Sequence, residues 1–450
     1  MQANFIEELR WRGMLHDMMP GTEEQLNKEM TAAYIGFDPT AASLHIGNLA
    51  TIMLLKHLQL CGHKPFALVG GATGMIGDPS GKVAEREFLS EETLRFNQDS
   101  IKKQLEKFLD FNSGENSAEM VNNYDWFKDF SFLGFLREAG KHLSVNYMMS
   151  KDSVKKRLET GISFTEFSYQ LLQGYDFYWL YKNKNVRLQM GGSDQWGNIT
   201  TGTEIIRRKE ATVYLPDIDY EVTNIRFLQE SEHRAFALTT PLVTKADGTK
   251  FGKSESGNVW LDPEMTTPYQ FYQFWLNTAD SECSRLLRVF TLYNQQEIEN
   301  LETEHAQSPH LRMMQKAIAK DVTTRVHSVH DFEIVKVASE LLFDKNVLEQ
   351  FELVDNKVIE ALDLIKVRKE DYQNCANLTD FLATLILDEN GEPLIFRSKG
   401  DTRKAIQANS VSINKVKITD PNKSLDFDLL RSNYLIINHG KQKVYVVQLT

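Results

Sequence analysis

The chain has 450 residues, a hydrophobic content of 42% and a formal net charge of −11. This length predicts about three domains, and the negative charge excludes a general attraction to polyanions, so that any contact with nucleic acid has to be local. The three cysteines are far apart and form no CxxC pair, which argues against a disulfide framework or a zinc site and fits a reducing, cytoplasmic compartment. The N-terminus lacks an apolar signal core, and no run approaches about 18 apolar residues, so we expect no membrane span.

The first part of the chain alternates between strand and helix patterns. The predicted elements are a helix ending near Met19, a second helix from Thr22, a strand over residues 31–37, a helix over 46–61 and a strand over 64–71. A strand, a helix and a second strand in this order are typical of a parallel, doubly wound sheet. In such sheets ligands bind at the carboxyl ends of the strands.

Polar side chains follow both predicted strands. After the first strand they are Asp38, Thr40, His45 and Asn48, and after the second they are Thr73 and Asp78. The free N–H groups at the start of the following helix suit a phosphate. An ordinary strand–turn–helix connection, capped by Thr40 or Ser43, explains the first stretch equally well when it is taken alone.

Residues 82–185 are predicted to be a mostly helical insertion between strands. Its segment 125–136 is rich in aromatic residues, which fits either burial in the domain core or a subunit interface. A helix follows in which Tyr169, Gln173 and Asp176 lie on one face, either solvated or lining a polar pocket. The apolar residues Phe164, Phe167, Leu171 and Leu172 are predicted to form its buried side.

Two further strands are predicted to end in polar loops. A strand over residues 186–190 runs into a glycine-rich stretch with Gln189, Asp194 and Gln195, where glycine allows a ligand to approach the backbone or simply permits a tight turn. A last strand over residues 235–244 leads to a loop with Lys250 and Lys253. These ammonium groups could bind phosphates, although a solvated Lys-Gly loop is the more common case.

The C-terminal third is predicted to be helical over residues 263–365, with a polar linker at 366–376. It ends in a small module with helices at 377–385 and 398–406 and strands at 411–414 and 443–449. From Arg397 to Lys443 there are ten Lys or Arg residues against four Asp residues, about +6 in a chain of −11. A local basic face of this kind favours an RNA- or DNA-binding module over a solvated basic surface.

The separated signals together resemble one family. The run from Pro39 to Asn48 matches the HIGH motif of the class I aminoacyl-tRNA synthetases, and Lys250-Phe-Gly-Lys-Ser254 matches their KMSKS motif. The run from Gly191 to Asn198 and the Tyr169–Asp176 face are similar to the bacterial tyrosyl-tRNA synthetase branch. The resemblance covers essentially the whole chain, with a C-terminal module like that of a small-subunit ribosomal protein. The chain departs from the HIGH motif at its last position, where it has Asn48 in place of His.

The resemblance implies a function, namely activation of L-tyrosine with Mg-ATP to tyrosyl-adenylate and transfer of the tyrosyl group to the 3′ end of tRNA(Tyr). The implied catalytic residues are Thr40, His45, Asn48, Lys250 and Lys253. The implied ATP site consists of these five with Asp38, Gly192, Asp194 and Ser254. The implied tyrosine site consists of Tyr34, Gly36, Thr73, Asp78, Tyr169, Gln173, Asp176, Gln189 and Gln195. The implied RNA contacts are Arg397, Lys399, Arg403, Lys404 and Lys415. No resident metal or tightly bound cofactor is expected.

The resemblance also implies an architecture. The expected parts are a Rossmann-like α/β catalytic domain at 1–262, an α-helical domain at 263–365, a linker at 366–376 and a small α+β RNA-binding domain at 377–450. A cytoplasmic homodimer is expected, with the aromatic segment 125–136 as a candidate contact. The alternatives are a tryptophanyl-type synthetase and a non-catalytic RNA-binding protein on a synthetase scaffold.

Overall fold

The computed structural model describes residues 4–78, 89–151, 154–155, 161–213, 234–244, 251–254, 257–388, 391–440 and 443–450. The chain divides into two compact units, which are described separately. The first consists of Met1–Thr266 and Thr278–Val326, and the second of Thr267–Asn277 and His327–Thr450. Among the described helices, none is both long enough and apolar enough to cross a bilayer.

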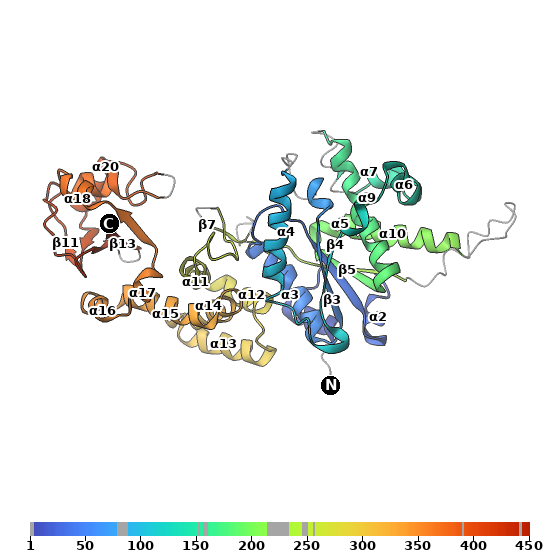
Figure 1. The fold of residues 1–450 in the computed structure, drawn as a ribbon. Helices are drawn as coiled ribbons and strands as arrows, with labels where there is room; N and C mark the ends of the chain where they lie inside the picture. The colour runs from blue at the N-terminus through green and yellow to red at the C-terminus, as the bar shows by residue number, and fades with distance from the viewer. Residues whose placement is uncertain are drawn as a thin grey trace. The chain divides into compact units, whose positions relative to one another are not determined.

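The first unit is built on a six-stranded sheet with the order β1-β6-β5-β2-β3-β4 (Figure 1). Its strands are β1 (Asp17–Met18), β2 (Ala32–Phe37), β3 (Lys64–Val69), β4 (Glu119–Asn122), β5 (Val186–Gly192) and β6 (Phe236–Thr240). Strands β2 to β6 are parallel to their neighbours, and β1 pairs antiparallel with β6. The predicted parallel sheet is therefore confirmed.

Helices cover the sheet in the doubly wound manner. The connection from β2 to β3 contains α3 (Ile46–Leu60), and the connection from β5 to β6 contains α10 (Trp196–Val213). These two connections proceed in opposite directions along the sheet, and right-handed crossovers therefore place α3 and α10 on opposite faces. The strand order reverses between β2 and β5, which is the position where ligands bind in such folds.

The remaining helical segments of this unit surround the sheet. They are α1 (Phe5–Arg12), α2 (Thr22–Lys28), η1 (Thr73–Met75), α4 (Glu91–Leu105), η2 (Gly114–Asn116), α5 (Tyr124–Phe127), α6 (Phe132–Glu138), η3 (Gly140–His142), α7 (Val145–Met149), α9 (Phe164–Lys184), η4 (Ser193–Gln195), α12 (Asp280–Phe290), α13 (Gln295–Gln307), η6 (Pro309–Leu311) and α14 (Met313–Val326). A two-stranded hairpin is formed by β7 (Lys253–Ser254) and β8 (Gly257–Asn258). The first helix ends at Arg12, because Gly13 adopts a left-handed conformation there, and not near Met19 as predicted.

Helix α9 turns its Tyr169–Asp176 face inward, which is one of the two predicted alternatives. Its polar residues Tyr169 and Asp176 are buried, whereas Phe164 is 70% exposed, so the prediction of Phe164 on the buried side is wrong. Phe167 and Leu171 are partly buried against a small apolar cluster, so the predicted apolar side is right for these two residues and wrong for Phe164 at the start of the helix.

The second unit combines helices with a five-stranded sheet of order β11-β10-β12-β13-β9. The strands are β9 (Leu364–Val367), β10 (Val411–Ile413), β11 (Val416–Lys417), β12 (Tyr434–His439) and β13 (Lys443–Leu449). The helical segments are α11 (Pro268–Leu276), α15 (Val329–Phe343), α16 (Val347–Leu353), α17 (Asn356–Glu360), α18 (Lys369–Asn374), α19 (Leu378–Asp380), a π-helical turn (Phe381–Leu385) and α20 (Lys399–Gln407).

The segment predicted as a linker, residues 366–376, is part of this second unit. Strand β9 pairs in parallel with β13, α18 follows it, and Val367 and Tyr372 belong to the same buried core as the C-terminal strands. The linker prediction is wrong because a strand of four residues paired at a sheet edge carries too short an apolar pattern to stand out.

Candidate active site

Two buried polar side chains meet at the point where the strand order reverses. Tyr34 on β2 is paired in register with Gln189 on β5, and their side chains are 1% and 2% exposed. The Tyr34 hydroxyl, the Gln189 Oε1 and the Gln173 Oε1 on α9 have no hydrogen-bond partner among the residues that the structure describes. Buried polar atoms are normally paired, so three unpaired ones in predicted site residues indicate a place for a polar ligand.

Asp176 is the buried carboxylate of this region. Its Oδ2 accepts a hydrogen bond from Asn123 Nδ2 at 3.0 Å, and its Oδ1 accepts one from Trp126 Nε1 at 2.9 Å. Burial raises the pKa of Asp176 to about 8, and the two hydrogen bonds act in the opposite direction. Burial likewise raises the pKa of the Tyr34 phenol well above its usual value, and the nearby Asp176 carboxylate adds to this effect.

A continuous chain of hydrogen bonds connects the ends of β2, β3 and β4. The carboxylate of Asp38 accepts from Thr73 Oγ1 and from the Tyr169 hydroxyl, both at 2.8 Å. Thr73 Oγ1 in turn accepts from Asn123 Nδ2 at 3.0 Å, and Asn123 also binds Asp176. The predicted crevice residues Asp38 and Thr73 are thus brought together with the α9 face in one network.

A second cluster connects the loop after β3 with the end of β5. Gln195 Nε2 donates to Asp78 Oδ2 at 2.8 Å, and Asn198 Nδ2 donates to Gln195 Oε1 at 3.3 Å. Asn198 is buried at the start of α10. The structure therefore places Asp78 and Gln195 together, as expected of residues that follow parallel strands of one sheet.

The predicted phosphate-binding turn forms the start of α3. His45 precedes the helix, and its backbone N–H donates to Asn48 Oδ1 at 3.1 Å. A Cβ on Gly47 would lie 2.7 Å from the His45 ring, so the absence of a side chain there lets the imidazole lie over the first turn. Asn48 thus caps the helix through its oxygen, while its amide group remains a hydrogen-bond donor.

The two signature segments lie next to each other. A Cβ on Gly252 would be 3.2 Å from the Ile46 Cβ, and the Ile46 N–H donates to the Val259 carbonyl, which follows the β7–β8 hairpin. The rings of His45 and Trp260 are 5.9 Å apart. Of the predicted lysine-loop residues, Lys250 lies outside the described residues, and Lys253 and Ser254 are placed by their backbone in β7.

The other predicted nucleotide contacts differ in exposure, and Thr40 and Asp194 are exposed. Gly36, which belongs to the predicted tyrosine site, is exposed as well, although its neighbours on β2 are mostly buried. Gly192 is buried, and a Cβ there would lie 2.8 Å from Asp194 Oδ1. An exposed glycine on a buried strand leaves the backbone open to a ligand.

Three site residues were missing from the predicted set, namely Asn123, Trp126 and Asn198. Asn123 and Trp126 follow β4, which is a strand of four half-buried residues that the sequence did not reveal. The same rule that selected Asp38 and Thr73, a polar residue just after a parallel strand, would have selected Asn123 had β4 been recognised.

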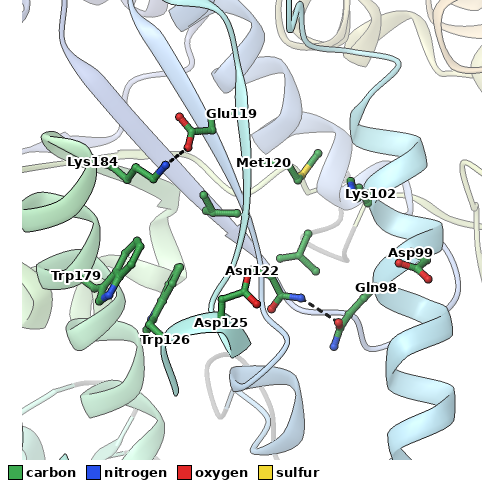
Figure 2. A pocket seen from close by; sticks show the side chains of 12 residues that line it. Gln98, Asp99, Lys102, Glu119, Met120, Asn122, Asp125, Trp126, Trp179 and Lys184 are labelled. Carbon is green, nitrogen blue, oxygen red and sulfur yellow. Dashed lines mark hydrogen bonds and ion pairs between the residues drawn. The ribbon is translucent and has the colours of Figure 1, made fainter. Parts of the chain in front are cut away.

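A cavity of about 440 Å³ lies outside the crevice, along the outer strand β4 (Figure 2). It is lined by α4, by β4 and by the stacked pair Trp126 and Trp179, whose ring centroids are 4.2 Å apart. None of the predicted ligand-binding residues lines it. Trp126 connects this cavity with the crevice, because it borders the cavity and its indole N–H donates to Asp176.

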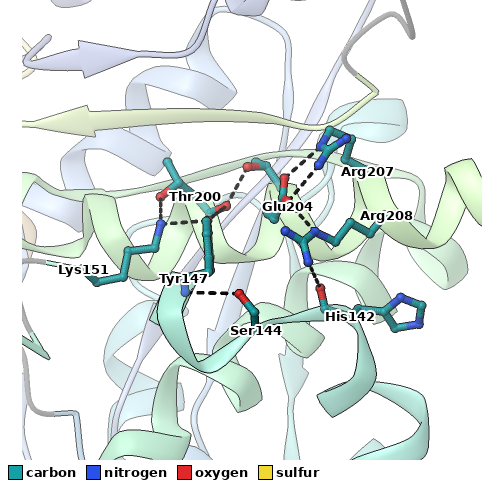
Figure 3. A network of polar contacts seen from close by, with 9 residues as sticks. His142, Ser144, Tyr147, Lys151, Thr200, Glu204, Arg207 and Arg208 are labelled. Carbon is teal, nitrogen blue, oxygen red and sulfur yellow. Dashed lines mark hydrogen bonds and ion pairs between the residues drawn. The ribbon is translucent and has the colours of Figure 1, made fainter. Parts of the chain in front are cut away.

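A polar network holds α7 against α10 (Figure 3). Lys151 Nζ donates to the Tyr147 hydroxyl at 2.7 Å and to Thr200 Oγ1 at 3.1 Å, and burial lowers the pKa of Lys151 to about 8. Nearby, Arg207 pairs with Glu204, and Arg208 donates to the His142 carbonyl at 2.9 Å. Because α10 begins directly after Gln195, this network supports the end of the crevice.

The predicted RNA-contacting residues are all exposed in the second unit. Arg397, Lys399, Arg403 and Lys404 lie on or next to α20, and Lys415 lies in the turn between β10 and β11. Lys399 forms an ion pair with Asp380 at 2.8 Å. The other four extend the positive charge over the surface of this unit.

Known families match most of the chain. The family of class I tRNA synthetases (W and Y) matches residues 26–344, and a tyrosine–tRNA ligase SYY-like C-terminal domain matches residues 375–447. A tyrosine–tRNA ligase from Cytophaga hutchinsonii is 58% identical over 449 residues and one from Porphyromonas gingivalis is 54% identical over 454 residues, with 99% of each chain covered. A C-terminally truncated mitochondrial tyrosyl-tRNA synthetase from Aspergillus nidulans superposes with a TM-score of 0.65 at 30% identity, over 76% of this chain and 94% of that one.

Proposed function

The chain belongs to the class I tRNA synthetases of the tyrosine and tryptophan type and is a tyrosine–tRNA ligase, and we propose from this premise how its residues divide the reaction. The enzyme activates L-tyrosine with ATP to tyrosyl-adenylate and pyrophosphate, and then transfers the tyrosyl group to its tRNA. The substrate carboxylate itself attacks the α-phosphate, so the first step needs no nucleophilic side chain. The protein has to position the two substrates and stabilise the charge that develops on the phosphates.

The tyrosine side chain is placed between Tyr34 and Asp176. The observation that carries this proposal is the buried Tyr34 hydroxyl, which has no partner among the described residues, next to a carboxylate held by two donors. The substrate phenol would donate to Asp176 and accept from Tyr34, so that the Tyr34 hydroxyl gains a partner and Asp176 a third hydrogen bond. Phenylalanine would leave the Tyr34 hydroxyl unpaired and would make no hydrogen bond to Asp176, and it would therefore be rejected.

The polar end of tyrosine is assigned to the rest of the crevice. Asp78, Tyr169 and Gln173 would hold the α-ammonium group, and Gln189 and Gln195 would orient the polar groups of the substrate. Gly36 and Thr73 would line the pocket. The unpaired oxygens of Gln173 and Gln189 support these roles, because an ammonium group supplies the donors that they lack.

The nucleotide is assigned to the start of α3 and the hairpin beside it. Thr40 and His45 would hold the triphosphate, with Asn48 as a neutral donor and Lys250, Lys253 and Ser254 closing over the pyrophosphate. Asp38 and Asp194 would contact the amino group or the ribose region of the adenylate, and Gly192 would allow its close approach. The closeness of Gly252 to Ile46 supports this division, since it places the two signature segments together. Mg²⁺ would enter with ATP as part of the substrate.

Pyrophosphate exchange tests the proposed substrate pocket. With ATP and labelled pyrophosphate, we expect exchange to depend on tyrosine and to be negligible with tryptophan or phenylalanine. Exchange driven by tryptophan would assign the pocket to the other branch of the family. The absence of exchange with every amino acid would support a non-catalytic RNA-binding protein.

Changing Trp126 to Phe is expected to shift the pH dependence of tyrosine activation. The Trp126 N–H stabilises the ionised form of Asp176, so its loss raises the Asp176 pKa above its value of about 8. Since the phenol donates to the ionised form, kcat/KM for tyrosine falls as the pH falls below this pKa. In the profile of kcat/KM against pH, the midpoint of the acidic limb should shift to higher pH by about one unit, which is equivalent to about 1.4 kcal/mol.

The matched control for this variant is Trp179→Phe, because Trp179 stacks on Trp126. Among the described residues, the hydrogen bonds to Asp176 come from Asn123 and Trp126 and not from Trp179. Profiles of kcat/KM from pH 6 to 10 should coincide for this control and the unmodified enzyme. An acid limb of Trp126→Phe that also coincides with theirs would contradict the role of the N–H group.

We propose that the enzyme is a homodimer that buries part of the predicted aromatic segment. Trp126 and its neighbours Phe127, Phe130 and Phe135 pack into the unit's own core. In contrast, Phe132 and Leu133 on α6 are exposed, as are Val145 on α7 and Phe164 on α9. A set of exposed large apolar side chains favours a protein interface.

Changing Leu133, which is 71% exposed, to Asp should convert the dimer to a monomer. A two-fold interface would bury two unpaired carboxylates, and the dissociation constant should rise by at least about a hundredfold. Sedimentation velocity at micromolar concentration measures this change. Leu60→Asp is the control, because Leu60 is 56% exposed on α3 and far from this segment in sequence. A dimer that survives Leu133→Asp would contradict the assignment.

The remaining assignments concern tRNA and organisation. We propose catalysis by residues 1–262, anticodon-side binding of tRNA by the helices of 263–365, and RNA binding by the C-terminal module, with whose core Val367 of β9 packs. The exposed Arg397, Lys399, Arg403, Lys404 and Lys415 support the last role. Location in the cytoplasm is proposed from the reduced cysteines and the participation in protein synthesis.

A further inference from the structure

Arg431 occupies a strained turn in the second unit. Arg431 and Ser432 have φ values of 45° and 61°, in the left-handed region that residues other than glycine rarely adopt. The turn is closed by hydrogen bonds between Leu430 and Tyr434, the first residue of β12. Two consecutive residues in this conformation persist only where their surroundings hold them.

The turn is held by contacts with α16 and α17. The Arg431 backbone N–H donates to Glu352 Oε1 at 2.7 Å, and its guanidinium donates to the Glu352 carbonyl at 3.1 Å, to the Val354 carbonyl and to Asn356 Oδ1. Beside it, the ring of Tyr434 lies 5.5 Å from that of Phe351. The Arg431 side chain thus binds the end of α16 and the start of α17, while the Glu352 side chain binds the backbone of the turn.

An arginine suits this position for two reasons. The carbonyls at the end of a helix carry partial negative charge, so a cation stabilises them. Only a guanidinium presents several donors in a fixed fork, and it can therefore reach two carbonyls and an amide oxygen at once, which an ammonium group cannot do in the same geometry. The Arg431 charge is therefore committed to protein contacts, unlike the exposed charges of α20 and Lys415.

We propose that Arg431 is a positioning residue for tRNA, which fixes the orientation of the basic C-terminal module on the α16–α17 helices. This inference rests on the proposed RNA-binding role of the module. One tRNA has to contact the basic module and other parts of the enzyme at the same time, so a module free to change its orientation would engage fewer phosphates in each complex. Tyrosine activation does not involve tRNA and would not depend on Arg431.

The experiment uses the full-length chain with Arg431→Ala and Arg431→Lys. For Arg431→Ala we expect the KM for tRNA to rise roughly tenfold, with tyrosine-dependent pyrophosphate exchange unchanged. The decisive measurement is the salt dependence of tRNA affinity. When the logarithm of the affinity is plotted against the logarithm of the salt concentration, the slope reports the number of phosphates that the enzyme contacts. We expect this slope to decrease by clearly more than the value of about one that the loss of a single phosphate contact gives.

Lysine at position 431 separates positioning from direct RNA contact. Lysine keeps the charge but not the fork, so we expect the Arg431→Lys slope and KM to remain close to those of Arg431→Ala. Full restoration by lysine, together with a slope change of about one in Arg431→Ala, would make Arg431 an RNA contact and overturn the proposal. An unchanged KM and slope in Arg431→Ala would overturn it as well.

Two controls complete the design. Arg368→Ala removes another arginine of this unit, which pairs only with Asp371 among the described residues, and it should leave tRNA affinity unchanged. A triple variant of Arg403, Lys404 and Lys415 to Ala tests the proposed function itself. If the triple variant binds tRNA normally, the RNA-binding role of the module fails. If it binds weakly while Arg431→Ala binds normally, only the positioning role fails.

Discussion

Replacing Asp176 with alanine is expected to abolish most of the preference for tyrosine over phenylalanine. The substrate phenol loses its buried acceptor, and Asn123 Nδ2 and Trp126 Nε1 lose theirs. A hydrogen bond to a buried charged group contributes about 1.5–3 kcal/mol, so the ratio of kcat/KM for the two amino acids should fall roughly tenfold to hundredfold or more. The value of kcat/KM should decrease for tyrosine and not for phenylalanine, because phenylalanine has no hydroxyl group that could donate to this acceptor.

Pyrophosphate exchange with tyrosine and with phenylalanine measures both values in one assay. Asp176→Asn serves as a second variant, because it keeps the shape of the side chain and one acceptor for the buried donors, and it guards against a general loss of folding. Both variants should keep the low phenylalanine-dependent exchange of the unmodified enzyme. An unchanged ratio of kcat/KM in both would show that the phenol is recognised elsewhere.

Replacing His45 with alanine is expected to slow adenylate formation roughly hundredfold or more, the usual effect of removing one donor that stabilises charge in a transition state. His45 stands before the first turn of α3, and its ring lies over Gly47, which has no side chain to displace it. The affinity for tyrosine should change little, because Tyr34 and Asp176 lie in another part of the crevice.

Single-turnover measurement of adenylate formation separates the rate of the chemical step from the affinity for tyrosine. His16→Ala is the control, since His16 is another histidine of the same unit, with a half-exposed side chain next to Asp17. A His45→Ala enzyme with a normal rate and a weakened affinity for tyrosine would contradict the assignment of His45 to the phosphates.

The sequence predicted the parts of the site that depend on a simple rule. Polar residues after the strands of a parallel sheet converge at one edge, and the structure brings Asp38 and Thr73 into one hydrogen-bond network. Asp78 and Gln195 meet for the same reason. The reversal of strand order between β2 and β5 places Tyr34 opposite Gln189, which confirms the doubly wound sheet.

The sequence could not reveal features that depend on tertiary context. The sequence alone could not decide whether the Tyr169–Asp176 face of α9 is solvated or buried, and it wrongly placed Phe164 on the buried side of this helix. Asn123 and Trp126 were missed because β4 is short and half-buried. Strand β9 was mistaken for linker, since its role depends on pairing with β13, about 80 residues later in the chain.

A crystal structure of the enzyme with a non-hydrolysable mimic of tyrosyl-adenylate tests the central claim most directly. The account predicts that the phenol oxygen lies within hydrogen-bond distance of both the Tyr34 hydroxyl and the Asp176 carboxylate. It also predicts that the ammonium group lies near Tyr169 and the nucleotide near His45. A mimic whose phenol contacts neither Tyr34 nor Asp176, or whose nucleotide lies away from the start of α3, would contradict it.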